Sequence, residues 1–368
     1  MIDESLLKRE ERAIFSLRAL YRRYGYLPFK MSKFEEYDLY VRNKDFLVSD
    51  RIITFNDTNG KLMALKPDVT LSIIKNGEDV AGAKQKLCYN ENVYRVSGST
   101  HQYKEIMQTG LECIGDLDLY DIFEVLSLAA QSLATVSADF VLDISHLGLL
   151  TALLDGVGGD EELRRKLSHY IAEKNSHDLI AVCHEAGVPE KQIEELCTFA
   201  GFYGDLGAVI QRLTPLCESS AALQALEELK ALYKLLRETP FADHIFFDFS
   251  IVNDMNYYNG IVFKGFLNGI CEGVLSGGQY DKLMAKMGRS ARAVGFALYL
   301  DLLEDLQRES RDCDVDVLLL YDEKTPVERI VDTVAALTGK GKSVSAQKTL
   351  PDSLRFRERV DLRGEVIQ

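Results

Sequence analysis

Seven polar side chains in four short stretches of the chain could together bind a small polar ligand. Carboxylate and amide groups bind an ammonium group, while carboxylates and phenols bind an imidazole. An arginine adds a planar fork that can bind a carboxylate or a phosphate through two hydrogen bonds. The seven side chains are Asp68, Thr70, Arg95, Gln108, Glu112, Tyr257 and Tyr258.

Taken singly, these residues also have ordinary structural explanations. The pair Tyr257 and Tyr258 stands in a β-rich segment, where aromatic residues commonly pack across strands. Glu112 would be a solvated charge on an outward-facing strand position, and Arg95 could equally be a structural ion-pair partner. Their order and flanking sequence must therefore carry any functional argument.

The histidines and cysteines do not predict a metal site. The seven cysteines are scattered, odd in number and without close pairs at ligand or redox spacing, which is typical of reduced thiols. No histidine stands at metal-ligand spacing from a cysteine or an aspartate. We expect no metal and no cofactor. The histidines are His101, His146, His169, His177, His184 and His244.

Length and charge limit the classes of function. The chain has 368 residues, 46% of them apolar and 27% charged, which suits one large core with one or two smaller units. A net charge of -14 and a pI near 5.0 argue mildly against a protein that grips phosphate backbones. The acidic N-terminus lacks the pattern of a secretory signal, and no uncharged apolar run approaches membrane-spanning length. We expect a cytoplasmic protein that does not enter a membrane.

The first third of the chain alternates helix and paired strands. Apolar spacings of three and four predict a helix over 5–24. Two extended runs, 51–55 and 61–65, flank Asn59-Gly60 and predict a β-hairpin. A second antiparallel pair is expected from 87–96 and 105–115. Asp121, with Glu124 three residues later, resembles the cap of a following helix, and a strand is expected at 140–144.

The middle and the end of the chain change character twice. Residues 147–240 are rich in Leu, Ala, Glu and Lys at helical spacing and predict a helical insert. After Pro240 the strand pattern returns at 245–252, 260–267 and 270–275, followed by expected helices at about 280–288 and 294–308. A short β-α-β pattern occupies 313–368. We therefore expect an α+β fold with one domain over 1–312 and a truncated α/β segment over 313–368.

Several of these stretches resemble, in order, the signature segments of class II aminoacyl-tRNA synthetases of the histidyl type. Leu65 to Thr70 resembles the loop that contacts the α-amino group of the amino acid. Val93 to Arg95, followed by Tyr103 to Glu112, resembles motif 2, which holds ATP and the amino acid. Met255 to Gly260 and Ser276 to Asp281 are similar to two further histidyl-type segments, and the resemblance covers roughly residues 5–305.

The departures from the synthetase pattern concern the cations that hold ATP. The resemblance places Asn253 where the family carries its catalytic arginine, Leu302 where motif 3 closes over ATP with arginine, and Gln279 in place of the arginine of Gly-Gly-Arg-Tyr-Asp. Ser97 replaces an acidic residue of motif 2. Losing one donor aimed at developing phosphate charge typically costs about 3 kcal/mol, so losing three should abolish adenylate formation.

A retained amino acid pocket with a lost ATP site is similar to the family of ATP phosphoribosyltransferase regulatory subunits. That resemblance implies a non-catalytic subunit in histidine biosynthesis that forms a hetero-octamer with the short catalytic chain, is required for its activity and confers allosteric feedback inhibition by histidine. It also implies a homodimer through the synthetase-like domain, and no tRNA is expected. In this reading the seven polar residues bind the effector histidine. A histidyl-tRNA synthetase or a related ATP-dependent ligase is the alternative, which nucleotide binding would distinguish.

Overall fold

The computed structural model describes residues 7–43, 52–77, 82–96, 101–251, 257–305 and 313–364. The chain forms two compact units, Met1–Leu306 and Gln307–Gln368, and each is described by itself. Three positions named in the sequence analysis lie outside the described residues. They are Arg51, the first residue of the predicted hairpin, Ser97 and Asn253.

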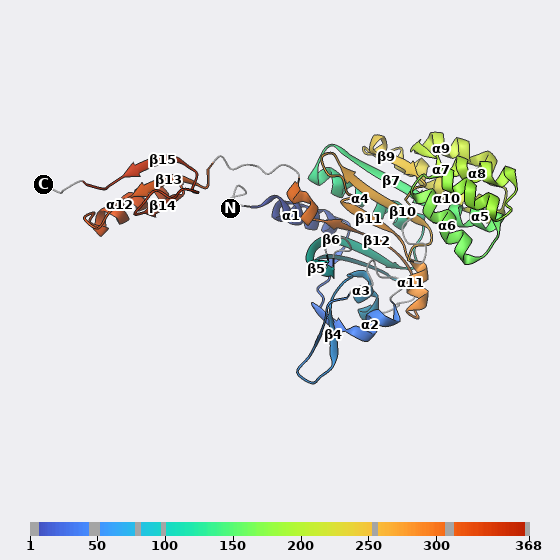
Figure 1. The fold of residues 1–368 in the computed structure, drawn as a ribbon, viewed down its shortest axis with the longest axis horizontal. Coiled ribbons are helices and arrows are strands. Elements are labelled where there is room, and N and C mark those ends of the chain that lie inside the picture. The colour runs from blue at the N-terminus through green and yellow to red at the C-terminus, as the bar shows by residue number, and fades with distance from the viewer. Residues whose placement is uncertain are drawn as a thin grey trace. The chain divides into compact units, whose positions relative to one another are not determined.

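A nine-stranded sheet forms the centre of the larger unit (Figure 1). Its inner strands are antiparallel, and parallel pairs join β1 to β5 and β7 to β9. This mixed sheet flanked by helices confirms the predicted α+β class. In sheet order the strands are β1 (Leu27–Pro28), β5 (Lys84–Val96), β6 (Tyr103–Gly115), β12 (Arg292–Tyr299), β11 (Leu275–Gln279), β10 (Ile261–Leu267), β7 (Phe140–His146), β9 (Ile245–Asp248) and β8 (Tyr203–Asp205).

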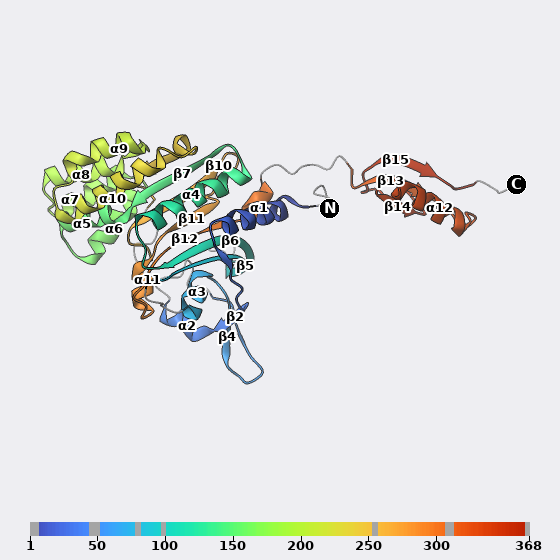
Figure 2. The ribbon, with the colours of Figure 1, turned by 180° about the vertical axis from the view of Figure 1, so that it is seen from behind.

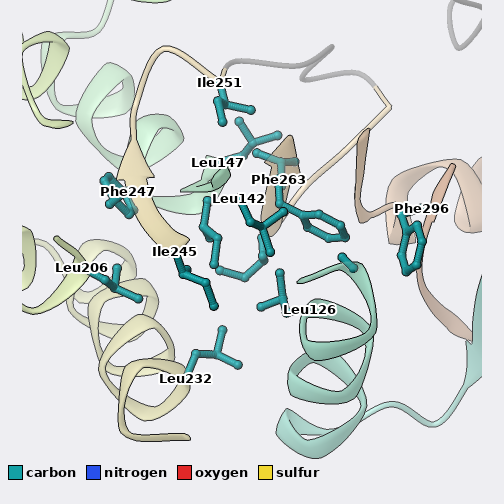
Figure 3. Close-up of a cluster of buried hydrophobic side chains, with 14 of the residues drawn as sticks. Leu126, Leu142, Leu147, Leu206, Leu232, Ile245, Phe247, Ile251, Phe263 and Phe296 are labelled. Carbon is teal, nitrogen blue, oxygen red and sulfur yellow. The ribbon is translucent and has the colours of Figure 1, made fainter. Parts of the chain in front are cut away.

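Helices α1 (Arg9–Arg23) and α4 (Leu119–Val136) pack together beside the sheet, as both views show (Figures 1 and 2). The predicted stripe of α1 buries Leu17, Leu20 and Tyr21, while Tyr24 stays 37% exposed. The core on this side continues from α4 through Leu142 of β7 and Phe263 of β10 toward the helical insert (Figure 3). Apolar side chains therefore bury one face of the sheet against helices, and polar side chains lie on part of the other face.

The opposite face of the sheet carries a second, smaller core. It joins Tyr89 of β5 to Leu71 and Ile73 of α3 (Thr70–Asn76) and to Leu283 of α11 (Asp281–Lys286). A small sheet in the order β2 (Phe34–Glu36), β4 (Leu62–Leu65), β3 (Thr54–Asn56) lies beside α2 (Tyr37–Arg42). The predicted hairpin is confirmed, with Gly60 at a positive φ of 78° in its turn.

Six helices between β7 and β9 gather at one end of the sheet (Figure 1). The short strand β8 and two 3-10 turns, Thr214–Leu216 and Ala242–His244, complete this stretch of the chain. Leu226, Leu229 and Leu232 of α10 are buried, at the spacing that the sequence showed. The helices are α5 (Leu147–Val157), α6 (Glu161–Ala172), α7 (Ser176–Glu185), α8 (Glu190–Ala200), α9 (Leu206–Leu213) and α10 (Ser220–Leu236).

The smaller unit is a three-stranded parallel sheet with one helix. The strands stand in the order β14 (Val344–Gln347), β13 (Val315–Leu320), β15 (Phe356–Asp361), and the helix is α12 (Val327–Thr338). The predicted β-α-β segment is present, and β15 is an additional strand that the sequence pattern did not indicate. Its alternation is carried mostly by charged residues on an edge strand, so the hydrophobic signal is weak.

Three predictions about local structure are wrong. The expected helix at 294–308 is strand β12, followed by a 3-10 helix at Asp301–Asp305, because Val294, Phe296 and Leu298 alternate with small residues between β6 and β11. The strand expected at 270–275 is the second wrong prediction. Residues 270–274 form the turn into β11, which begins at Leu275 and contains Gly277 and Gly278.

The third correction concerns the cap of α4. Asp118, rather than Asp121, caps this helix by accepting the Tyr120 N–H at 2.8 Å, and Asp121 completes the capping box from the third helical position. By length and composition α4 could cross a membrane, but ten of its residues are buried inside the unit, as expected of a core helix. Its buried acidic residues Asp121 and Glu124 form ion pairs with the partly exposed Lys84 and Lys86, each at 2.6 Å.

Candidate amino acid pocket

The polar face of the central sheet carries a cavity of about 640 Å³ whose floor is made of small residues. Gly278 of β11 stands opposite Gly295 of β12, and the next pair on this face of the sheet is Ser276 opposite Ala297. A Cβ at Gly278 would press on the Tyr258 ring at 2.8 Å. The glycines are therefore needed here to let side chains from neighbouring strands lie flat over the sheet.

All seven residues predicted from the sequence line this one cavity. They come from segments far apart in the chain: the loop before α3 and the first residue of that helix, strands β5 and β6, and the stretch before β10. The structure thus brings the predicted set together, while their role in binding a ligand stays a prediction.

Glu112 is the central acid of the pocket. It is 2% exposed and accepts hydrogen bonds from the Thr70 hydroxyl at 2.8 Å and from the Tyr280 phenol at 2.6 Å. Burial raises the pKa of Glu112 to about 8, although both hydrogen bonds oppose the shift. A buried carboxyl with two fixed donors is a suitable partner for an imidazole, because either group can carry the shared proton near neutral pH.

Asp68 stands at the start of α3 and faces the same cavity. Its carboxylate accepts the Leu71 N–H at 2.9 Å, and burial raises its pKa while that bond and the Arg95 charge lower it. The Arg95 Nε donates to the Pro67 carbonyl at 2.9 Å, and the ammonium of the fully buried Lys66 contacts Glu91 at 2.8 Å. These two contacts fasten the Asp68 loop to β5.

Gln108 and the tyrosine pair complete the predicted set. Gln108 is 3% exposed and stands opposite Tyr299 of β12 on the cavity side of the sheet. The rings of Tyr257 and Tyr258 lie 4.6 Å apart at 52°, and burial raises the pKa of both phenols well above the ordinary value. Both phenols therefore stay protonated at neutral pH and keep an O–H group that can donate a hydrogen bond.

Two of the three lost arginine positions are built into the fold. The Gln279 side chain is 2% exposed and accepts the Ile261 N–H at 2.7 Å, a contact for which Gly260 leaves room. Leu302 packs against the main hydrophobic core and does not line the cavity. Asn253 lies outside the described residues. Gln279 and Leu302 thus serve the packing of the protein rather than an anionic ligand.

The residues on one side of the cavity were not predicted from the sequence as site residues. Lys264 and Phe266 of β10, Glu272 of the following turn, Ser276 and Tyr299 also line it. Ser276 and Tyr299 are hydrogen bonded at 3.1 Å. The alternation of Ile261 to Leu267 could have indicated that Lys264 shares a sheet face with Phe266, because side chains two apart on a strand point the same way.

This geometry defines a class of protein: a class II aminoacyl-tRNA synthetase-like fold with a polar cavity on its antiparallel sheet. The histidyl-tRNA synthetase family model matches residues 2–303. The chain therefore belongs to the histidyl-tRNA synthetase family.

Curated relatives agree with the narrower resemblance drawn from the sequence. The chain is 29% identical over 339 residues to a Clostridium kluyveri protein named ATP phosphoribosyltransferase regulatory subunit. The alignment covers 88% of this chain and 85% of the relative. A Syntrophotalea carbinolica protein of the same name is 28% identical over 366 residues, covering 96% and 85%. The predicted resemblance to such subunits is confirmed.

Solved structures share the fold. A Bacillus halodurans protein described as an ATP phosphoribosyltransferase regulatory subunit/histidyl-tRNA synthetase aligns with a TM-score of 0.77, 23% identity and coverage of 99% and 97%. Histidyl-tRNA synthetase from Nostoc aligns with a TM-score of 0.69 and 18% identity, covering 94% and 83%. A chain of the ATP phosphoribosyl transferase (HisG:HisZ) complex from Thermotoga maritima gives 0.63 and 20%, covering 81% and 97%.

Proposed function

We propose that this chain is a non-catalytic regulatory subunit of ATP phosphoribosyltransferase and that histidine, bound in the cavity over β11 and β12, is its effector. The single observation that carries the proposal is what occupies the positions where the synthetase pattern has arginines. Gln279 and Leu302 are committed to packing, while Asp68 and Glu112 still face one polar cavity. A site of this kind suits an amino acid and lacks the fixed charges that a triphosphate requires.

The relatives support the choice of partner. The curated relatives carry the name of the regulatory subunit, and the Thermotoga maritima structure is described as a complex of that transferase. The catalytic partner of this chain is then a short-form ATP phosphoribosyltransferase that works in the cytoplasm. Histidine in the pocket lowers the partner's rate because it binds one state of the hetero-octamer more tightly than the other.

An exposed aromatic patch supports a homodimer within that assembly. Phe34, Phe55 and Leu62 are 48%, 38% and 43% exposed on the small sheet β2-β4-β3, and the two rings lie 5.2 Å apart. Exposed apolar patches of this kind mark protein interfaces. A Phe34→Ser/Phe55→Ser double variant should therefore sediment as a monomer. A Phe15→Ser control, which changes an exposed aromatic residue on α1, should leave the dimer intact.

Reconstitution tests the proposed function. The chain is mixed with a short-form ATP phosphoribosyltransferase, and formation of the phosphoribosyl-ATP product is followed with and without histidine. We expect a stable complex, a rate that depends on this chain, and a lower rate when histidine is added. Absence of a complex together with an unchanged rate would refute the subunit assignment. A complex that histidine does not affect would refute the effector assignment alone.

A further inference from the structure

The cavity extends past the residues that the family resemblance assigns, toward a lysine on β10. The Lys264 side chain lines the cavity on the side of β10, the far side from β6 in the sheet order β6-β12-β11-β10. In register it stands directly beside Ser276, which is paired in turn with Ala297 of the floor. Lys264 is therefore next to the floor on which a small ligand would rest.

Lys264 and Glu112 approach this floor from opposite sides. Strands β6, β12, β11 and β10 are consecutive in the sheet, so the two residues stand three strand spacings apart, roughly 14 Å at about 4.8 Å per spacing. Glu112 leans over Gly295 of β12, because a Cβ on that glycine would overlap the carboxylate. The space left between the two side chains suits one amino acid lying across β12 and β11.

The direction of the lysine stem separates the two charges further. The stem packs against Gly273, where a Cβ would overlap it, and the ammonium lies 5.5 Å from the centroid of the Phe266 ring. Phe266 is two residues further along β10, whereas Glu112 belongs to the row on the other side, with Gly295 and Gly278. The pocket is thus polarised, with a carboxyl toward one end and an ammonium toward the other.

Lys264 is also uncommitted within the described residues. It stands opposite Asp143 of β7 in register, yet it forms no ion pair with Asp143 or with any other described carboxylate. Arg95 is the other cation among the described lining residues, and its Nε is held by the Pro67 carbonyl while its charge acts on Asp68. Arg95 lies on β5 and Lys264 on β10, so Lys264 is the cation at the β10 end of the cavity.

From these contacts we infer that Lys264 binds the carboxylate of the amino acid in this pocket and so selects a free amino acid over its uncharged analogues. The inference rests on the proposed function, because it assumes that an amino acid occupies the cavity. Ser276 and Tyr299 flank the same end, and the hydroxyl that accepts in their hydrogen bond keeps its own proton to donate to the same group. An oxyanion is the shared chemistry that this end recognises, and the carboxylate is the source chosen here.

Ligands that differ only at the carboxylate test the inference. Calorimetric titration of the full chain with L-histidine and with L-histidinol, which carries a hydroxymethyl group instead, measures the preference for the carboxylate. We expect a preference of about tenfold or more, since hydrogen bonds to charged groups contribute that much. In Lys264→Met the preference should fall to within about twofold while histidinol affinity is unchanged. Lys264→Arg should keep most of it.

A control variant and three further outcomes distinguish a carboxylate subsite from a phosphate subsite and from the absence of an effector site. Lys234→Met, an exposed lysine change on α10, should behave as the parent chain. A preference that survives in Lys264→Met would overturn the inference. If inorganic phosphate displaces histidine from the parent chain but not from Lys264→Met, the subsite is one for phosphate and the carboxylate assignment is wrong. If neither imidazole ligand binds the parent chain, the proposed effector site itself fails.

Discussion

Gly295 of β12 stands opposite Glu112 of β6, and the carboxylate of Glu112 occupies the space where a side chain at position 295 would begin. The central acid of the pocket therefore depends on a residue that carries no functional group. This relationship explains why a glycine is needed within a buried strand, where it otherwise weakens the sheet.

Gly295→Ala should displace Glu112 and remove histidine binding. Overpacking of a buried position typically costs about 1–3 kcal/mol, so the variant should still fold with a lower midpoint of urea unfolding. Calorimetry and urea titration measure the two effects. Gly156→Ala is the matched control, because nothing lies near a Cβ there and alanine suits helix α5. Unimpaired histidine binding by Gly295→Ala would contradict the geometry.

Glu112 should make the folded state less stable as the pH rises. Its folded pKa, about 8, lies above the unfolded value near 4.5, so its contribution is complete below pH 4.5 and is lost as the pH rises through 8. The difference in unfolding free energy between Glu112→Gln and the parent chain should therefore shift in favour of the variant between pH 5 and 8. Urea titrations at several pH values measure it, with the exposed Glu194→Gln change as control. A difference independent of pH would show that Glu112 is not held protonated.

Asp143 should give a second, independent pH effect. This residue is 7% exposed, its Oδ1 has no hydrogen-bond partner among the described residues, and burial together with the nearby Asp248 raises its pKa to about 7. Asp143→Asn removes the charge, so it should stabilise the protein above pH 7, by about 1 kcal/mol, and have little effect near pH 4. Asp243→Asn, at an exposed aspartate, should change the unfolding free energy by less than about 0.5 kcal/mol at either pH. Destabilisation by Asp143→Asn at pH 8 would count against the repulsion.

The buried pair of Lys66 and Glu91 should be essential for the Asp68 loop. Breaking a buried ion pair by removing one partner typically costs about 3–5 kcal/mol, because the other charge stays buried alone. Lys66→Met should lose stability in this range and bind histidine more weakly. Lys61→Met breaks a pair with Glu36 in which both side chains are about half exposed, so it should cost much less than Lys66→Met. Equal losses in the two variants would refute the role assigned to burial.

Much of this site could be predicted because motif order carries it. The seven polar residues were found from short stretches whose spacing matched a family, and all of them line one cavity. Lys264 and Ser276 were missed because each lies in a strand pattern that also fits ordinary packing. Only the register Lys264–Ser276–Ala297 brings them beside the pocket, and pairing partners are not encoded locally.

Local structure was predicted less well where glycines occur. A pair such as Gly277-Gly278 is typical of a turn, yet both residues lie within β11, where the ring of Phe263 crowds Gly277 and the ring of Tyr258 crowds Gly278. Gly295 lies in the segment 294–308 that was expected to be helical, and it is crowded in the same way by Glu112 within strand β12. Glycine in a strand signals close approach of other groups, and the identity of those groups becomes known only with the fold.

The most direct test of the central claim is histidine-dependent exchange of labelled pyrophosphate into ATP by the purified chain. We propose a cavity that keeps partners for an amino acid and lacks the fixed cations that activate a triphosphate. We therefore expect no exchange above background at histidine concentrations that saturate binding. Exchange that requires both histidine and ATP would show that the chain forms an adenylate, and it would contradict the non-catalytic assignment.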